Sequence, residues 1–175
     1  MVTKHGSTFT LDNVDRGILY QLQLNARKAT HEEISDAVGV SPSTVRNRIA
    51  QLEQANIIET YTPELNYEQA GYPLRVQFIC TAPPQDRSQC AQDALDINGV
   101  LTIHETITSD RNLSIEVVAA DPKDLAETTQ KLGELNLQIH SSDIILETYT
   151  QPCKHFEDAG AQAGSQPQET PTEDG

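Results

Sequence analysis

The sequence predicts an α+β chain in which a helix-turn-helix part is followed by a ferredoxin-like part. Two amphipathic segments with helix-capping residues meet at Gly39, as in a helix-turn-helix. Further along, strand and helix patterns alternate in the ferredoxin-like order βαββαβ. We therefore expect a flexible N-terminus (1–10), a helix-turn-helix domain (11–56) and a hinge strand or linker (57–72). A ferredoxin-like domain (73–150) and a disordered acidic tail (151–175) should follow.

The first predicted helix runs from Leu11 to Ala26. Asp12 is suited to the N-cap, where its carboxylate accepts a backbone hydrogen bond, and Asp15 lies near the positive end of the helix dipole. Apolar side chains recur at helical spacing and give this helix one face that can pack against the next two helices. These side chains are Val14, Ile18, Leu19 and Leu22.

The second helix is predicted to begin after Thr30, because Thr30 and Glu33 have the spacing of a capping box. Its buried face is expected to consist of Ile34, Ala37 and Val38. Gly39 follows at once, where a left-handed backbone conformation costs a glycine little.

The third helix is predicted to begin after Ser41, a favourable N-cap, with Pro42 at its first position. Val45, Ile49 and Leu52 form its buried stripe. Its opposite side is polar and has no carboxylate before Glu53.

This polar side has the residue types that read DNA. Arg and Asn pair bidentately with guanine and adenine edges, and hydroxyl and N–H groups at a helix N-terminus can hold a phosphate. Arg46 and Asn47 are the first candidates for base contacts, whereas Arg48 could contact a phosphate or pair with a carboxylate inside the domain. An ordinary helical corner is the alternative for the whole stretch. The DNA-binding candidates are Ser41, Ser43, Thr44, Arg46, Asn47, Arg48 and Gln51.

After the third helix, the β-branched and aromatic residues of IIETYTPELNY predict a strand that leads into a hinge. Pro63, Gly71 and Pro73 interrupt regular structure there. In the second half, strands are expected at Arg75–Ala82, Val100–Thr108, Leu113–Ala119 and Leu137–Tyr149, and helices at Asp86–Ile97 and from Asp121-Pro122 to about Leu132. Val76, Phe78 and Cys80 should share one strand face, and Ala91, Ala94 and Leu95 the apolar side of a helix.

The charge of the chain is unevenly distributed. The net charge is −14, but residues 1–60 carry six Lys and Arg against seven Asp and Glu, and the remainder carries six against nineteen. The many acids and few lysines resemble proteins adapted to molar salt, where the Debye length falls to about 3 Å and an acidic protein can approach DNA. A generically acidic protein is the alternative.

No apolar run is long enough to span a membrane, and the first residues lack the apolar core of a signal peptide. The three cysteines have no C-x-x-C pair, which favours reduced thiols and a cytoplasmic location. Motifs of common enzymes are missing, so we predict that the chain is not an enzyme. No cofactor or metal is expected, because the spacing of Cys153, His155, His104 and His140 is a weak ligand pattern.

With both halves considered, the chain resembles the Lrp/AsnC family of transcription regulators, also called feast/famine regulatory proteins. The resemblance covers roughly residues 10–150 and rests on LDNVDRGIL (11–19), Ala26-Arg27, VGVSPSTVRNRIAQLE (38–53) and IIETYTPELNYEQAGYPL (57–74), and on the βαββαβ order. It implies a winged-type helix-turn-helix, a hinge strand, and a ferredoxin-like domain that dimerises, assembles further and senses small ligands, typically amino acids. The chain looks like an archaeal, salt-adapted member.

One turn departs from the family pattern. The family's G-D-Y-D turn lies beside the effector pocket, and here the matching residues are Ser109, Asp110, Arg111 and Asn112. These four are the ligand-binding candidates. Loss of the last aspartate removes a partner for an amino group, and Arg111 adds a cation, so a ligand with a carboxylate or another anion is conceivable. The alternative is that SDRN is simply a good β-turn.

The leading hypothesis is a sequence-specific regulator that binds palindromic promoter sites in double-stranded DNA as a dimer or higher oligomer, possibly an octamer, and is modulated by a small effector such as an amino acid. A low-specificity DNA-organising protein is the second hypothesis. A ligand-binding or assembly module without DNA binding is the third, which the net charge of −14 would favour.

Overall fold

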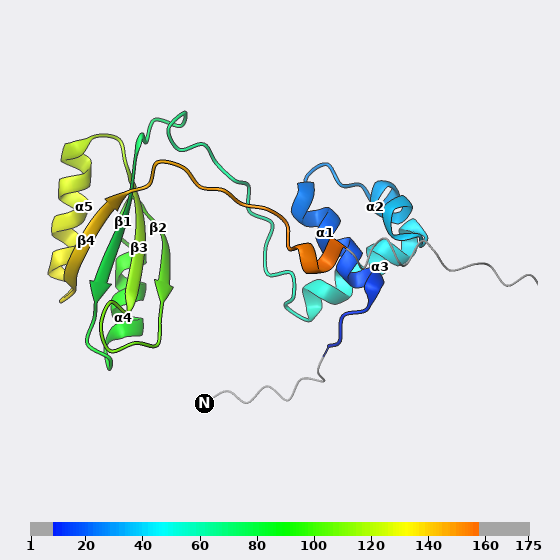
Figure 1. The fold of residues 1–175 in the computed structure, drawn as a ribbon, viewed down its shortest axis with the longest axis horizontal. Coiled ribbons are helices and arrows are strands. Elements are labelled where there is room, and N and C mark those ends of the chain that lie inside the picture. The colour runs from blue at the N-terminus through cyan, green and yellow to red at the C-terminus, as the bar shows by residue number, and fades with distance from the viewer. Residues whose placement is uncertain (1–8, 158–175) are drawn as a thin grey trace, which may run out of the picture. The chain divides into compact units, whose positions relative to one another are not determined.

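The computed structural model describes residues 9–157 in two compact units (Figure 1). Among these residues, the helical unit contains 9–62 together with 150–157, and the sheet unit contains Pro63–Tyr149. Most of the predicted N-terminal segment and residues 158–175 of the predicted tail lie outside the described residues.

Three helices build the helical unit: α1 at Asn13–Asn25, α2 at His31–Val38 and α3 at Pro42–Gln54. Each begins as its capping residues predict. Asp12 and Asp15 form a reciprocal capping box on α1, Thr30 and Glu33 form one on α2, and the Ser41 side chain accepts a hydrogen bond from the Thr44 N–H. Gly39 ends α2 in the left-handed region with φ of 70°.

The three helices share one apolar core. Its buried members are Ile18, Leu19, Ile34, Val38, Val45 and Leu52. The prediction that Ala37 belongs to this face is wrong, because Ala37 is exposed and Ser35 is buried in its place. Ser35 can be buried because its hydroxyl donates to the Glu32 carbonyl oxygen at 2.9 Å, which satisfies the polar group within the helix.

The predicted hinge strand does not form within the described part of the chain. Residues 59–66 contain no strand, and residues 67–71 form a turn. An extended segment becomes a strand only where a neighbour offers a ladder of backbone hydrogen bonds. Every strand among residues 9–157 pairs within a single sheet of the sheet unit, so this segment has no such neighbour among those residues.

The sheet unit has the predicted βαββαβ order. Its elements are β1 (Leu74–Thr81), α4 (Arg87–Leu95), β2 (Val100–Glu105), β3 (Leu113–Ala119), α5 (Pro122–Glu134) and β4 (Gln138–Ile144). The strands lie in the order β2-β3-β1-β4, and all three neighbouring pairs are antiparallel. This arrangement confirms the ferredoxin-like fold.

Both helices of the sheet unit pack on the same face of the sheet. Cys90 and Ala94 of α4 and Leu132 of α5 join the buried cluster that includes the predicted β1 residues Val76, Phe78 and Cys80. Leu95 was expected in this core, but it is 52% exposed and Cys90 occupies the inward position of α4. Burial raises the pKa of the Cys80 thiol to about 11.

Two predicted strands are shorter than expected, and each stops close to the end of its partner strand. β2 stops at Glu105, which pairs with Leu113 at the start of β3. β4 stops at Ile144, opposite Val76, and only one further backbone bond follows, from the Ile145 N–H to the Arg75 carbonyl oxygen at 2.8 Å.

The predicted disorder of residues 151–157 is wrong. A 3-10 helix at Lys154–Phe156 packs on α1, and Phe156 lies against the apolar core of the helical unit. The Cys153 N–H donates to Oε1 of Gln23 at 3.0 Å. The polar composition of the tail conceals this contact because Phe156 is the only large apolar side chain in residues 151–157.

We expect Phe156→Ala to lower the free energy of unfolding of the helical unit by about 1–2 kcal/mol, since a partly buried aromatic ring is lost. Differential scanning calorimetry of the full chain measures this loss. Ile107→Ala is the matched control, because the Ile107 side chain is 96% exposed. Equal melting profiles for Phe156→Ala and the unsubstituted protein would contradict the packing of the C-terminal segment.

Candidate nucleic-acid interface

The polar side of α3 faces solvent. Ser41, Ser43, Arg46, Asn47 and Gln51 are exposed, whereas Thr44 is partly buried. The buried side chains Val45 and Leu52 lie on the other side and fix this orientation. The predicted base-contact candidates Arg46 and Asn47 are therefore accessible to a bound molecule.

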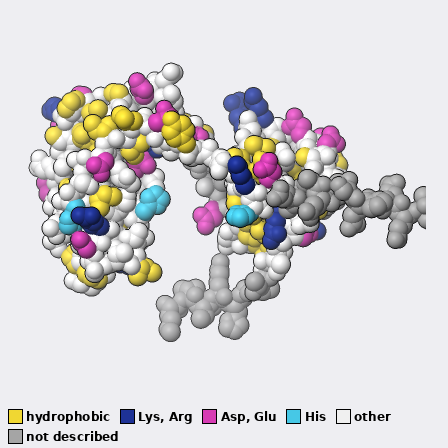
Figure 2. All heavy atoms as spheres, viewed as in Figure 1, with side chains coloured by type: hydrophobic (Ala, Val, Ile, Leu, Met, Phe, Trp, Pro, Cys, Tyr) yellow, Lys and Arg dark blue, Asp and Glu magenta, His cyan; other side chains and the backbone are white. Residues whose placement is uncertain are grey.

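Hydroxyl groups gather at the N-terminus of α3. Oγ of Ser41 lies 2.9 Å from Oγ of Ser43 and 2.8 Å from Oγ1 of Thr44. No acidic residue is present in the first turn of α3. The positive end of the helix dipole is thus unneutralised there, and these groups could hold a phosphate. Elsewhere, the visible surface of the helical unit carries both cationic and acidic side chains (Figure 2).

Arg48 points to the first turn of α1. Its Nη2 lies 2.9 Å from Oδ2 of Asp12, and its Nη1 lies 3.3 Å from Oδ1 of Asp15. The two carboxylates also bond each other's backbone: the Asp15 N–H donates to Oδ1 of Asp12, and the Asp12 N–H to Oδ2 of Asp15. Of the two roles that the sequence leaves open for Arg48, the structure shows the ion pair inside the domain.

The two carboxylates differ in environment. Asp15 is only 1% exposed, and burial raises its pKa above the ordinary value, with the nearby charge of Asp12 acting in the same direction. Partial burial also tends to raise the pKa of Asp12, but the hydrogen bond from the Asp15 N–H and the charge of Arg48 lower it further, so the net shift is downward. The arginine therefore compensates two adjacent acids, one of them buried.

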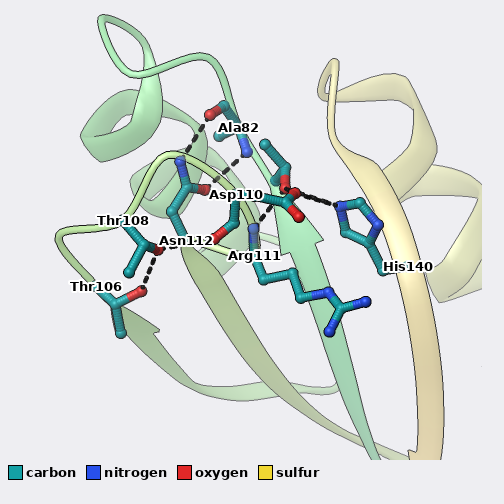
Figure 3. A network of polar contacts seen from close by, with 8 residues as sticks. Ala82, Thr106, Thr108, Asp110, Arg111, Asn112 and His140 are labelled. Carbon is teal, nitrogen blue, oxygen red and sulfur yellow. Dashed lines mark hydrogen bonds and ion pairs between the residues drawn. The ribbon is translucent and has the colours of Figure 1, made fainter.

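At the ligand-binding candidates, the structure corrects the role of Asn112. Its side chain is fully buried, accepts a hydrogen bond from the Ala82 N–H and donates one to the Ala82 carbonyl oxygen, each at 2.9 Å (Figure 3). Both polar atoms of the amide are thus used to join the turn to the end of β1. Asn112 holds the backbone rather than facing a ligand.

Asp110 is also engaged within the chain. Oγ1 of Thr81 donates to its Oδ1 at 2.7 Å, and Nε2 of His140 lies 3.2 Å from the same oxygen (Figure 3). The hydrogen bond from Thr81 and the neighbouring His140 lower the pKa of Asp110. Sequence reasoning missed Thr81 and His140, although antiparallel pairing of the first and third strands would have placed the end of one beside the turn that starts the other.

Arg111 and Ser109 remain exposed in this turn. Arg111 has a left-handed backbone with φ of 51°, and its N–H donates to Oγ1 of Thr81 at 2.7 Å. Within residues 9–157, no carboxylate lies within ion-pair distance of its guanidinium. The turn therefore presents one cation to solvent.

Over residues 9–157 no three His, Cys, Asp or Glu side chains come together as a metal site would require. None of the described helices combines the length and apolar character needed to cross a membrane.

Comparisons with known proteins agree with this geometry. Residues 11–59 match the family described as winged helix-turn-helix DNA-binding. The chain is 24% identical over 141 residues to the HTH-type transcriptional regulator FL11 of Pyrococcus abyssi, covering 80% of this chain and 92% of that protein. It is 41% identical over 66 residues to the regulatory protein AsnC of Escherichia coli K12, covering 38% of this chain and 43% of AsnC.

Solved structures extend the similarity over both units. The structure of E. coli AsnC is similar with a TM-score of 0.66 and 25% identity, covering 83% of this chain and 98% of that chain. The leucine response regulatory protein LrpA of Mycobacterium tuberculosis has the same fold, with a TM-score of 0.68 and 22% identity, covering 81% of this chain and 96% of that chain. These relatives are transcriptional regulators, not enzymes. Residues 11–59 therefore form a winged helix-turn-helix DNA-binding domain, and the chain is similar over both units to transcriptional regulators of the Lrp/AsnC type.

Proposed function

We propose that this regulator is sequence-specific and reads palindromic promoter sites through α3. The observation that carries the proposal is the exposed polar side of α3, where Arg46, Asn47 and Gln51 project away from the buried stripe. Such side chains can reach base edges in the major groove. The hydroxyl groups of Ser41, Ser43 and Thr44 would contact the phosphate that positions the helix.

The proposed working form is a dimer or a higher oligomer. Support comes from large apolar side chains that the sheet unit leaves exposed at its surface, where a contiguous apolar patch would mark a protein–protein contact. They are Leu65, Tyr72, Ile144, Leu146 and Tyr149. A symmetric dimer would place its two α3 helices on half-sites one helical turn, or a multiple of it, apart.

The proposed effector, if the turn at Ser109–Asn112 binds one, is a small anion. Arg111 is the exposed cation of this turn, and the buried amide of Asn112 leaves no free polar atom for an amino group. A carboxylate could pair with the Arg111 guanidinium in a two-point contact. Ser109 could add a hydroxyl contact from the same turn.

We further propose that the protein works in a salt-rich cytoplasm. The support is its charge of −14, of which residues 1–60 contribute only −1. At about 0.1 M salt the acidic residues 61–175 would repel a phosphate backbone over about 10 Å, whereas at about 1 M salt the repulsion extends over only about 3 Å.

Footprinting in molar salt tests the proposal. We expect discrete protected sites with two-fold symmetry upstream of genes. Uniform protection would instead indicate a low-specificity DNA-organising protein, and no protection or gel shift in molar salt would exclude a DNA-binding regulator. The slope of log affinity against log salt, about −0.9 per neutralised phosphate, then counts the phosphate contacts.

A further inference from the structure

The contact between Arg48 and the first turn of α1 is the basis of this inference. Among the three helices α1, α2 and α3, it is the only side-chain polar link between two helices. The rest of the contact between α1 and α3 is apolar, through residues such as Ile18 and Leu52. Apolar packing is non-directional, so it restrains the rotation and sliding of α3 less sharply than a two-point polar contact does.

The chemistry of this contact suits an arginine. Each carboxylate of the capping box uses one oxygen for the other's backbone N–H and offers its second oxygen to Arg48. The planar guanidinium has two nitrogens that reach the two carboxylates at once, whereas a lysine ammonium is a single point charge. Removing Arg48 would leave the buried Asp15 without its counter-charge.

We propose that Arg48 is a positioning residue, which fixes α3 against the first turn of α1 and so aims the neighbouring Arg46 and Asn47 at the bases. This inference rests on the proposed function of α3 in reading DNA. Arg48 acts through α3 and contacts no phosphate, because both ends of its guanidinium are held by Asp12 and Asp15. The two aspartates belong to the DNA-binding machinery although they are anions.

The two roles predict opposite results for conservative variants. If Arg48 contacted a phosphate, Arg48→Lys would keep much of the affinity for DNA, since a lysine also binds phosphate. If Arg48 positions α3, Arg48→Lys would lose this affinity, because lysine cannot span both carboxylates. Asp12→Asn separates the roles further: asparagine remains a good N-cap, but it lacks the charge that holds Arg48. Simple electrostatics predicts tighter DNA binding for this variant, whereas loss of positioning predicts weaker binding.

The experiment measures binding of a footprinted DNA site by fluorescence anisotropy over a range of salt concentrations. We expect Arg48→Lys to weaken binding about tenfold with an unchanged salt slope, and Asp12→Asn to weaken it about three- to fivefold. Asp36→Asn is the matched control, because it removes an equal charge from an exposed position of α2 and should not weaken binding. Near-normal binding by Arg48→Lys, a salt slope reduced by about 0.9 in Arg48→Ala, or tighter binding by Asp12→Asn would overturn the proposal.

A second measurement needs no DNA. Hydrogen exchange in the free protein should become faster in the first turn of α1 and along α3 in Arg48→Lys, but not in Arg46→Lys. Unchanged exchange in Arg48→Lys would also overturn the proposal. If Asn47→Ala weakens DNA binding and Arg48→Lys does not, only the positioning role fails. If the unsubstituted protein binds no DNA, the proposed function fails, and the exchange rates still decide whether Arg48 fixes α3.

Discussion

Arg46→Ala and Asn47→Ala are each expected to weaken binding to the cognate DNA site by about 1–3 kcal/mol, or roughly 5- to 150-fold. Both side chains are exposed on α3, so their loss should leave the fold unchanged and remove only contacts with DNA. A good bidentate pair with a base edge accounts for an effect of this size. Gel-shift titrations with a cognate and a scrambled site, carried out in molar salt, measure it.

Base contact and phosphate contact can be separated in the same titrations. A lost base contact weakens binding to the cognate site more than to the scrambled site and leaves the salt slope nearly unchanged. A lost phosphate contact weakens both complexes alike and lowers the slope by about 0.9. Arg27→Ala controls for the loss of an exposed positive charge outside α3, since Arg27 is exposed but precedes α2. Full affinity for the cognate site in both Arg46→Ala and Asn47→Ala would exclude α3 as the reading helix.

The second large effect concerns stability. Asn112→Ala should lower the free energy of unfolding of the sheet unit by about 2–4 kcal/mol, because the Ala82 N–H and carbonyl oxygen would be left buried without partners. Asn112 is fully buried and makes both of these hydrogen bonds. Urea unfolding followed by far-UV circular dichroism measures the loss. Ser109→Ala, at an exposed position of the same turn, should change stability by less than about 0.5 kcal/mol.

Asn112→Asp should make the stability of the sheet unit depend on pH. The carboxylate could still accept from the Ala82 N–H, but it would face the Ala82 carbonyl oxygen without a proton to donate. Burial and this oxygen raise the pKa of such a carboxyl in the folded state above its unfolded value of about 3.9. The folded variant then binds more protons than the unfolded one, so its stability should rise as pH falls through the raised pKa. A loss of stability on mild acidification would contradict this account.

Much of the fold follows from local patterns in the sequence. Thr30, Gly39 and Ser41 mark helix ends because each satisfies a backbone requirement with residues three or four positions away. The alternation of Val76, Phe78 and Cys80 likewise identifies a buried strand face without knowledge of its neighbours. These features depend on short-range geometry, which the sequence expresses directly.

Features that depend on distant residues are less accessible from sequence. Arg48 and Asp15 are 33 residues apart, and an arginine that pairs with an acid has the same local pattern as one that contacts phosphate. The segment after α3 has the composition of a strand, but strand formation needs a partner that only the sheet order reveals. The burial of Asn112 depends on Ala82, which lies in another strand region of the chain.

The contact of Phe156 with the helical core has a consequence for the order in which the protein is completed. Because residues 150–157 group with residues 9–62, the sheet unit is a topological insertion within the helical unit. Domains generally fold as their residues leave the ribosome, from the N-terminus onward. Here α1, α2 and α3 emerge first, yet their core lacks Phe156 until after the sheet unit has been synthesised. The unit that begins to fold first is therefore the last to be finished.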